Sequence, residues 1–227
     1  MADREARNRM AAVIERYLHE EIQAFQFDAE LETISSETSD ATVRDVRFAL
    51  WFQYDDFIDH PVSGFREEWD YCQRLLLLLR SDGHIETTQH RHWTWRQAVA
   101  AVCLAAFAVS AVRAGFGEHL LFVAIPYGVA SMLLSAWGRR AKHPLDEAMT
   151  PLLPFSSVSE LLRVRRSVPH FRRERYPDAL RPRRFRSPIT EFVMYLPWMS
   201  IWLLSSPVVL LFQTLPDARL ESKVVLP

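Results

Sequence analysis

The segments QAVAAVCLAAFAVSAV (97–112) and HLLFVAIPYGVASMLLSAWG (119–138) decide the architecture of this chain. Neither contains Asp, Glu, Lys or Arg, and a short turn joins them. A helix needs about 20 residues, with a range of about 17–25, to cross the hydrocarbon core of a bilayer. Both segments are apolar on all faces, whereas a helix on the surface of a soluble core is apolar on one. We therefore expect a transmembrane helical hairpin over residues 94–138, with a buried hairpin in a soluble protein as the alternative.

A third uncharged segment, FVMYLPWMSIWLLSSPVVLLFQTLP (192–216), follows farther along the chain. Its 25 residues are enough to cross a bilayer, so we expect a third transmembrane helix within residues 189–216. Pro197 and Pro207 lie inside it, and proline frees backbone carbonyls that neighbouring groups must satisfy. A re-entrant path, which enters and leaves on one side, is the alternative to a full crossing.

The net charge of -1 and the mean hydropathy of -0.08 conceal a segregation along the chain. Residues 1–93 hold 19 acidic and 10 basic residues, whereas residues 138–188 hold 13 basic and 5 acidic residues. The first block thus has a net charge of -9 and the second a net charge of +8. Such asymmetry indicates surfaces that face different partners. The composition excludes a disordered chain, and two cysteines exclude a disulfide scaffold.

Basic residues flank the predicted hairpin at its outer ends, while its turn, residues 113–118, holds a single arginine. Cytoplasmic loops of membrane proteins carry an excess of Lys and Arg. We therefore expect a multi-pass protein of the cytoplasmic (inner) membrane with a cytoplasmic N-terminus and a cytoplasmic segment over residues 139–188. A full third crossing would place a short tail, residues 217–227, on the opposite side. The flanking basic residues are Arg91, Arg96, Arg139, Arg140 and Lys142.

Residues 1–93 predict a cytoplasmic helical domain, so the expected fold class is all-α. Apolar residues recur at helical spacing from Met10 to Phe25, and a Ser/Thr-rich stretch over residues 33–40 interrupts the pattern. A second helix is predicted from residue 39 or 40, which would cap it, to His60 before a proline.

A third helix is predicted from Gly64 to Arg80, with Gly83 available as a stop. It contains five consecutive leucines, 75–79, so nearly every side of that turn must be covered.

Asp55, Asp56 and Asp59 form the pattern D-D-x-x-D. The pattern resembles the aspartate-rich motif with which class I terpene synthases and prenyltransferases hold magnesium and a diphosphate. On a helix, carboxylates at this spacing can present oxygens to a hard cation. That resemblance implies a metal site at these three residues, although the second metal motif of those enzymes is absent from the sequence. No other cofactor is expected.

The alternative for the aspartates is a solvated acidic face, because the helical wheel places them opposite the apolar stripe. Phe48 and Phe52 share that face, and exposed aromatics beside acidic groups are typical of a contact surface.

The basic segment 139–188 is rich in proline and interrupted by one short helix, which a capping box at Ser157 and Glu160 predicts. Arginine beside aromatic residues can bind phosphate groups, and confinement between spans favours anionic lipid headgroups over nucleic acid. A purely topological role, in which the charges only fix orientation, is equally compatible. The candidate lipid-contacting residues are Arg163, Arg165, Arg166, Arg172, Arg173, Arg175, Arg183 and Arg184.

Three parts of the chain resemble a group of bacterial membrane proteins that has no assigned activity. They are LWFQYDD (50–56) with EWDYCQRLLLLL (68–79), PFSSVSELL (154–162) with RERYP (173–177), and SPVVLLFQ (206–213). The resemblance implies the same domain layout and adds no catalytic residue.

These observations favour a non-enzymatic, membrane-anchored interaction or scaffolding protein that contacts anionic lipid, with a protein partner or a second copy of itself. Two alternatives stay open. One is a membrane enzyme that acts on a lipid-linked phosphate through the aspartates. The other is a transporter or channel subunit, against which the uncharged spans argue.

Overall fold

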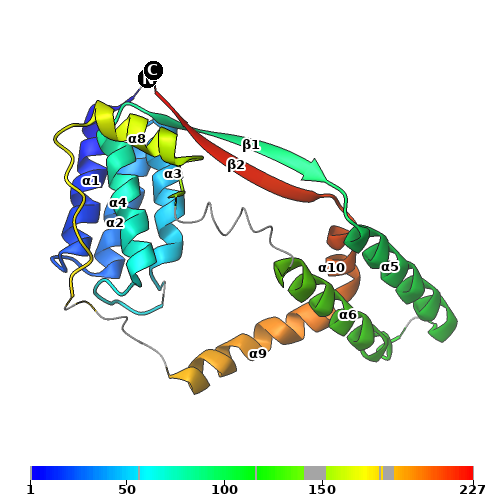
Figure 1. Cartoon of the computed structure of the whole chain (residues 1–227). Coiled ribbons are helices and arrows are strands. Elements are labelled where there is room, and N and C mark those ends of the chain that lie inside the picture. Colours follow the sequence, from blue (N-terminus) through cyan, green and yellow to red (C-terminus); the bar gives the residue numbers. More distant parts are fainter. Residues whose placement is uncertain are drawn as a thin grey trace. The chain divides into compact units, whose positions relative to one another are not determined.

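The computed structural model describes residues 2–55, 57–115, 117–140, 152–178, 180 and 187–226 of the chain, without the side chains of residues 139–140 and 219–221. The fold is mostly helical and divides into two compact units (Figure 1). The bundle unit combines residues 1–88, 145–185 and 221–227, and the apolar unit combines residues 89–144 and 186–220.

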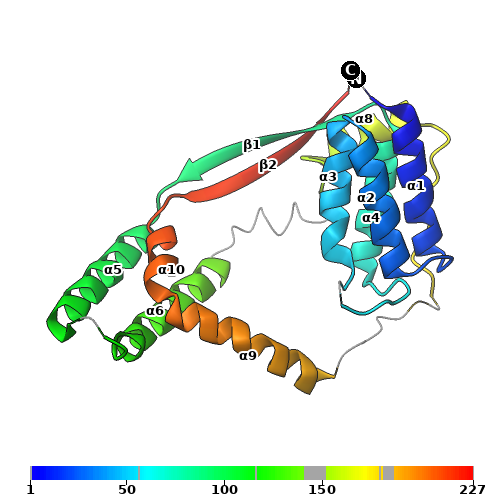
Figure 2. The ribbon, with the colours of Figure 1, turned by 180° about the vertical axis from the view of Figure 1, so that it is seen from behind.

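Four helices form the core of the bundle unit: α1 (Arg4–Leu18), α2 (Ala24–Glu37), α3 (Ala41–Leu50) and α4 (Arg66–Arg80). Each packs against the next along the ring, and α1 also closes on α4 (Figures 1 and 2). The five leucines of α4 are all buried, as their sequence required. The ring places them between α1 and α3, so the four helices bury apolar surface that no single helix could cover.

The predicted second helix is too long. Asp40 caps α3 as expected, since its carboxylate accepts a hydrogen bond from the backbone N–H of Thr42 at 2.9 Å. The α-helix then ends at Leu50, and a 3-10 turn over Trp51–Gln53 leads into a loop. Residues 55–60 are therefore not helical among those described. The Ser/Thr-rich stretch also deviates from expectation, because α2 continues through it to Glu37.

A buried ion pair joins α1 to the N-terminus of α3. The side chains of Arg7 and Asp40 are only 2% and 4% exposed, and the Arg7 Nε donates to an Asp40 carboxylate oxygen at 2.6 Å. The guanidinium also donates to the carbonyls of Ser81 and Gly83 at 3.0 and 2.7 Å. These bonds satisfy a charge that would be costly to bury alone.

Helix α8 (Val158–Ser167) packs against α4 and begins with the predicted cap, in which the Ser157 hydroxyl accepts from the Glu160 backbone N–H at 3.2 Å. The Glu160 side chain is buried, and its carboxylate accepts hydrogen bonds from Ser156 and from the backbone N–H of Val224. Val164 and Val224 belong to the same apolar core as the four helices. Segments far apart in the sequence thus complete one bundle.

The all-α prediction is wrong in one respect, because strands β1 (His84–His92) and β2 (Asp217–Val225) pair in a two-stranded antiparallel ribbon (Figure 1). The expected short tail is therefore mostly strand. Nearly every described side chain of β1 is exposed. Such a strand lacks the alternation of apolar and polar residues by which a strand is predicted from sequence, because its pairing with β2 holds it in place.

The apolar unit contains the predicted hairpin as α5 (Trp95–Ala114) and α6 (Leu120–Arg140). Residues 95–114 of α5 and 120–138 of α6 are long and apolar enough to cross a membrane. Trp95 and Trp137 contact each other edge to face, with ring centroids 4.9 Å apart, where the first helix begins and the second ends. Tryptophans at this level are typical of a membrane–water interface.

The third apolar segment is two helices rather than one, α9 (Pro188–Leu204) and α10 (Ser206–Gln213), bent by 76° at their junction. Among the described residues, two helices are long and apolar enough to cross a membrane, or three if the bent pair is one span. Pro207 stands in the first turn of α10, where its missing N–H costs no helical hydrogen bond.

Small residues bring α6 close to the bend. A β-carbon on Gly128 would lie 2.8 Å from the Cα and the carbonyl oxygen of Leu203, so only glycine fits. Nearby, the Ser206 hydroxyl donates to the carbonyl of Ala124 at 3.0 Å. Ala101 and Ala105, the other small pair in the spans, are exposed. Close helix packing in the apolar unit therefore occurs at Ala124 and Gly128 of α6.

Candidate functional sites

Asp55 and Asp59 of the D-D-x-x-D pattern lie in the loop that follows α3, and Asp56 lies outside the described residues. The Asp55 carboxylate accepts from the backbone N–H of Phe57 at 2.8 Å, which closes a local turn. The Asp59 carboxylate instead accepts from the backbone N–H of Phe25 at 3.0 Å. Because the helix ends before them, the aspartates do not share one helical face.

Asp59 and His60 together cap the N-terminus of α2. The His60 carbonyl accepts from the Ala24 backbone N–H at 2.9 Å, next to the bond that Asp59 makes. A carboxylate is stabilised at a helix N-terminus by the unsatisfied N–H groups there. His60 is buried, and its Nε2 accepts from the Asp55 backbone N–H at 3.0 Å. Among the described residues, no group of three or more His, Cys, Asp or Glu side chains could hold a metal.

Aromatic side chains around this loop are exposed. Phe48 and Phe52 are 62% and 65% exposed and contact each other edge to face, with centroids 5.5 Å apart. Trp51 packs on Phe52 in the same way, at 5.2 Å. We call these three residues the aromatic patch; it spans the C-terminal end of α3 and the 3-10 turn that follows. Clustered exposed aromatics are typical of contact surfaces.

The described residues 152–178 of the basic segment pack on the bundle unit. Helix α8 buries Val164 and Glu160 and exposes Arg163, Arg165 and Arg166. In the segment without helix or strand that follows, residues 171–177, the side chains of Arg172, Arg173 and Arg175 are exposed. The other two candidates, Arg183 and Arg184, lie outside the described residues.

Residues 171–177 are anchored to α4. Arg173 forms an ion pair with Asp70, and the Glu174 backbone N–H donates to the Gln73 side chain at 3.0 Å. The ring of Tyr176 packs edge to face on Trp69, with centroids 6.0 Å apart. The arginines are therefore held on a folded surface, and one of the six described candidates already has an acidic partner.

Cys72 of α4 offers no reactive thiol at neutral pH. The side chain is buried in the bundle core, and this burial raises its pKa to about 12. A thiol must be deprotonated to act as a nucleophile.

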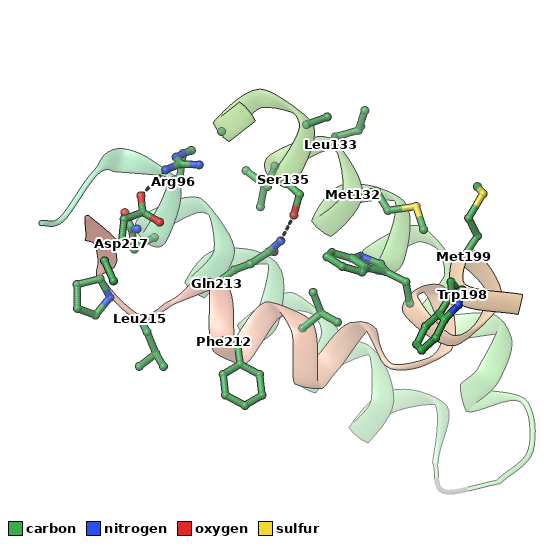
Figure 3. A pocket seen from close by; sticks show the side chains of 18 of the residues that line it. Arg96, Met132, Leu133, Ser135, Trp198, Met199, Phe212, Gln213, Leu215 and Asp217 are labelled. Atoms are coloured by element: carbon green, nitrogen blue, oxygen red, sulfur yellow. Dashed lines mark hydrogen bonds and ion pairs between the residues drawn. The ribbon is translucent and has the colours of Figure 1, made fainter. Parts of the chain in front are cut away.

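The apolar unit contains an open cavity of about 1060 Å³ between α5, α6, α9 and α10 (Figure 3). Arg96 and Asp217 lie at one end of it, and Trp198 and Met199 lie at the other (Figure 3). Most of the intervening lining is apolar, including Leu133. The cavity is thus amphipathic along its length.

Polar side chains beside the cavity fix α10 against α6. The Gln213 amide donates to the Ser135 hydroxyl at 2.8 Å (Figure 3). It also donates to the Ser131 carbonyl at 2.9 Å. The Ser131 hydroxyl accepts from the indole N–H of Trp202 at 2.9 Å. Hydrogen bonds between helices in a low-dielectric setting contribute to holding such a bundle together.

An ion pair lies at the polar end of the cavity. Arg96 donates to the Asp217 carboxylate, and its guanidinium lies over Gly138 of α6, where a larger residue would collide with it. In the sequence, Arg96 is one of the charges that flank the hairpin, and Asp217 is the first residue after the third uncharged segment. An opposite charge just outside each of two uncharged segments is the signal that could have paired them.

No protein family, curated protein or solved structure matches this chain. The geometry of the sites therefore stands alone as the basis for function.

Proposed function

We propose that this chain is a membrane-anchored interaction protein that holds its bundle unit against the anionic surface of the cytoplasmic membrane. One observation carries the proposal. The bundle unit is assembled from chain segments that precede α5, that lie between α6 and α9, and that follow α10. Segments that share one hydrophobic core must lie on one side of a membrane. The apolar helices therefore leave and return to the same side.

This requirement is met if α9 and α10 form a re-entrant pair in place of a third crossing. Helix α10 has 8 residues and is therefore only about 12 Å long, against about 30 Å of hydrocarbon. It runs along α6 from the level of Ala124 to the level of Ser135, toward the end at which α6 finishes. The residues that follow α10 reach the beginning of α5, where Asp217 pairs with Arg96. All three chain segments of the bundle unit then lie in the cytoplasm.

Exposed arginines supply the contact with the membrane surface. α8 and the residues after it expose six of the candidate arginines on the unit that the spans confine near the bilayer. Each basic residue close to an anionic surface contributes about 1 kcal/mol of attraction. Because the membrane helices already provide the anchor, this attraction serves to orient the bundle unit.

The aromatic patch is the surface left for a protein partner or for a second copy of the chain. Asp55 and Asp59 follow it in the sequence, and its three exposed side chains are all aromatic. Such residues dominate the energetics of protein interfaces, because they bury large areas at small entropic cost.

The lipid contact can be tested with the full chain in vesicles that contain a trace of headgroup-photoactivatable phosphatidylglycerol. We expect cross-links in residues 158–178, and a several-fold loss of them in the double variant Arg165→Gln/Arg166→Gln. The matched control is Arg44→Gln/Arg66→Gln, which removes the same charge from exposed positions on α3 and α4. Equal labelling of the two double variants, or no labelling of residues 158–178 in the wild type, would contradict the proposal.

A further inference from the structure

We propose that the cavity of the apolar unit binds a phospholipid with a phosphoethanolamine headgroup. This site is distinct from the exposed arginines of the bundle unit, and the inference goes beyond the proposed function. The headgroup lies at Arg96 and Asp217, and an acyl chain follows the apolar lining toward Trp198 and Met199 (Figure 3).

The position of the cavity selects a membrane lipid as its occupant. The cavity lies at the end of the hairpin where α5 begins and α6 ends, beside the interfacial pair Trp95 and Trp137. A lipid headgroup and the first part of its tail occupy this level of a bilayer. Its volume of about 1060 Å³ is slightly larger than the usual range for ligand sites, which is roughly 300–1,000 Å³.

The polar end of the cavity selects a zwitterionic headgroup. Arg96 and Asp217 are of opposite charge and are about one quarter and one third exposed, so both can be reached. A guanidinium has five N–H donors and a carboxylate has about four acceptor positions, so neither is saturated by their mutual bond. A lipid phosphate can share Arg96 while the lipid ammonium shares Asp217. An anionic headgroup would place its negative charge beside the Asp217 carboxylate, which is unfavourable.

The ammonium must also be able to donate hydrogen bonds. A primary ammonium has three N–H donors for the Asp217 carboxylate, as in lysine, whereas a quaternary ammonium such as that of phosphatidylcholine has none. Charge-assisted hydrogen bonds are about twice as strong as neutral ones. The site therefore discriminates between two zwitterionic lipids as well as against anionic ones.

Native mass spectrometry of the full chain, released from micelles after incubation with an equimolar lipid mixture, tests the proposal. The mixture contains phosphatidylethanolamine, phosphatidylcholine and phosphatidylglycerol with identical acyl chains. We expect the first lipid to be retained at least several-fold more than the other two. Equal retention of the three, preferential retention of phosphatidylglycerol, or retention of none would overturn the proposal.

Two variants locate the binding. Asp217→Asn keeps the size of the side chain and removes the charge that holds the ammonium, so retention should shift toward phosphatidylglycerol by about tenfold. Val209→Phe narrows the apolar part of the cavity and should reduce retention of every lipid.

The control Asp82→Asn removes the carboxylate of another Arg–Asp pair, Arg4 with Asp82 in the bundle unit, and should leave lipid selection unchanged. An Asp217→Asn protein with wild-type selection, or a Val209→Phe protein with wild-type retention, would place the lipid elsewhere. These outcomes are independent of the arginines of α8.

Discussion

At the scale of single residues, the sequence predicts roles that depend on local spacing and misses those that depend on the fold. Asp40 is recognisable as a helix cap because the cap is formed with residues that follow it directly. Its partner Arg7 looks like any surface arginine of an amphipathic helix, and only the ring of four helices buries it. The aspartates after α3 show the converse, since their spacing suggested a metal site and the structure uses Asp55 and Asp59 as acceptors for backbone N–H groups.

The variant Asp40→Asn should destabilise the bundle unit by about 3 kcal/mol at neutral pH, because it leaves the Arg7 charge buried without its counter-charge. Asparagine caps helices as well as aspartate, so the change isolates the charge. Thermal unfolding of the full chain in detergent, followed by circular dichroism at 222 nm, measures the loss. The control Glu37→Gln breaks the exposed pair of Arg9 and Glu37 and should cost less than about 1 kcal/mol. Equal losses in the two variants would mean that burial adds nothing to the pair.

The same residue determines part of the acid sensitivity. Burial alone would raise the pKa of Asp40, but hydrogen bonds from Arg7 and from the backbone N–H groups of Asp3 and Thr42 lower it below the ordinary value. A lowered folded-state pKa stabilises the protein above the unfolded-state value of about 3.9, and this stabilisation is lost as the pH falls through the folded-state pKa. Asp40→Asn should therefore reduce the dependence of the unfolding temperature on pH below about pH 5. Some dependence should persist, since the pKa of Asp3 is lowered as well.

At the scale of elements, the sequence predicts continuous apolar helices and capping residues, but it does not predict paired strands or contacts between distant helices. Helices α4, α5, α6 and α8 follow from leucine runs, uncharged segments and a capping box. Strand β1 does not, because its side chains are polar on both faces and its partner lies 125 residues or more away. The bend between α9 and α10 has a local signal in Pro207, which stands in the first turn of α10. The close approach of Leu203 to Gly128 of another helix has no such signal.

Gly128→Leu should separate α6 from α9, because its β-carbon alone would collide with the backbone of Leu203. Overpacking of this kind costs about 1–3 kcal/mol when side chains can adjust, and the obstacle here is backbone, so we expect the upper end of that range. Resistance to unfolding by sodium dodecyl sulfate measures the loss. Ala101→Leu adds the same side chain to an exposed position of α5 and should change stability by less than about 0.5 kcal/mol. A tolerated Gly128→Leu would show that α9 does not pack at this position.

At the scale of the whole molecule, the sequence indicates where the chain resides better than how often it crosses. Two helices fit a membrane by length and composition, as the uncharged segments predicted. The number of crossings depends on contacts between distant segments. The bond from the Val224 backbone N–H to Glu160 joins the residues after α10 to the residues before α9. Val224 also packs beside Gly83, just before β1. A count of apolar segments alone gives an odd number of crossings and separates these residues by a bilayer.

The crossings can be counted by fusing a reporter after Pro227 of the full chain. The re-entrant arrangement predicts a cytoplasmic end, so a fused green fluorescent protein should fluoresce and a fused alkaline phosphatase should be inactive. Fusion after Gly117, in the turn between α5 and α6, should give the opposite pair of signals and serves as the control for the hairpin. An active phosphatase after Pro227 would require a full third crossing. A full third crossing is incompatible with the pairing of β2 with β1 and with the burial of Val224 in the bundle core. That result would therefore contradict the proposed one-sided assembly.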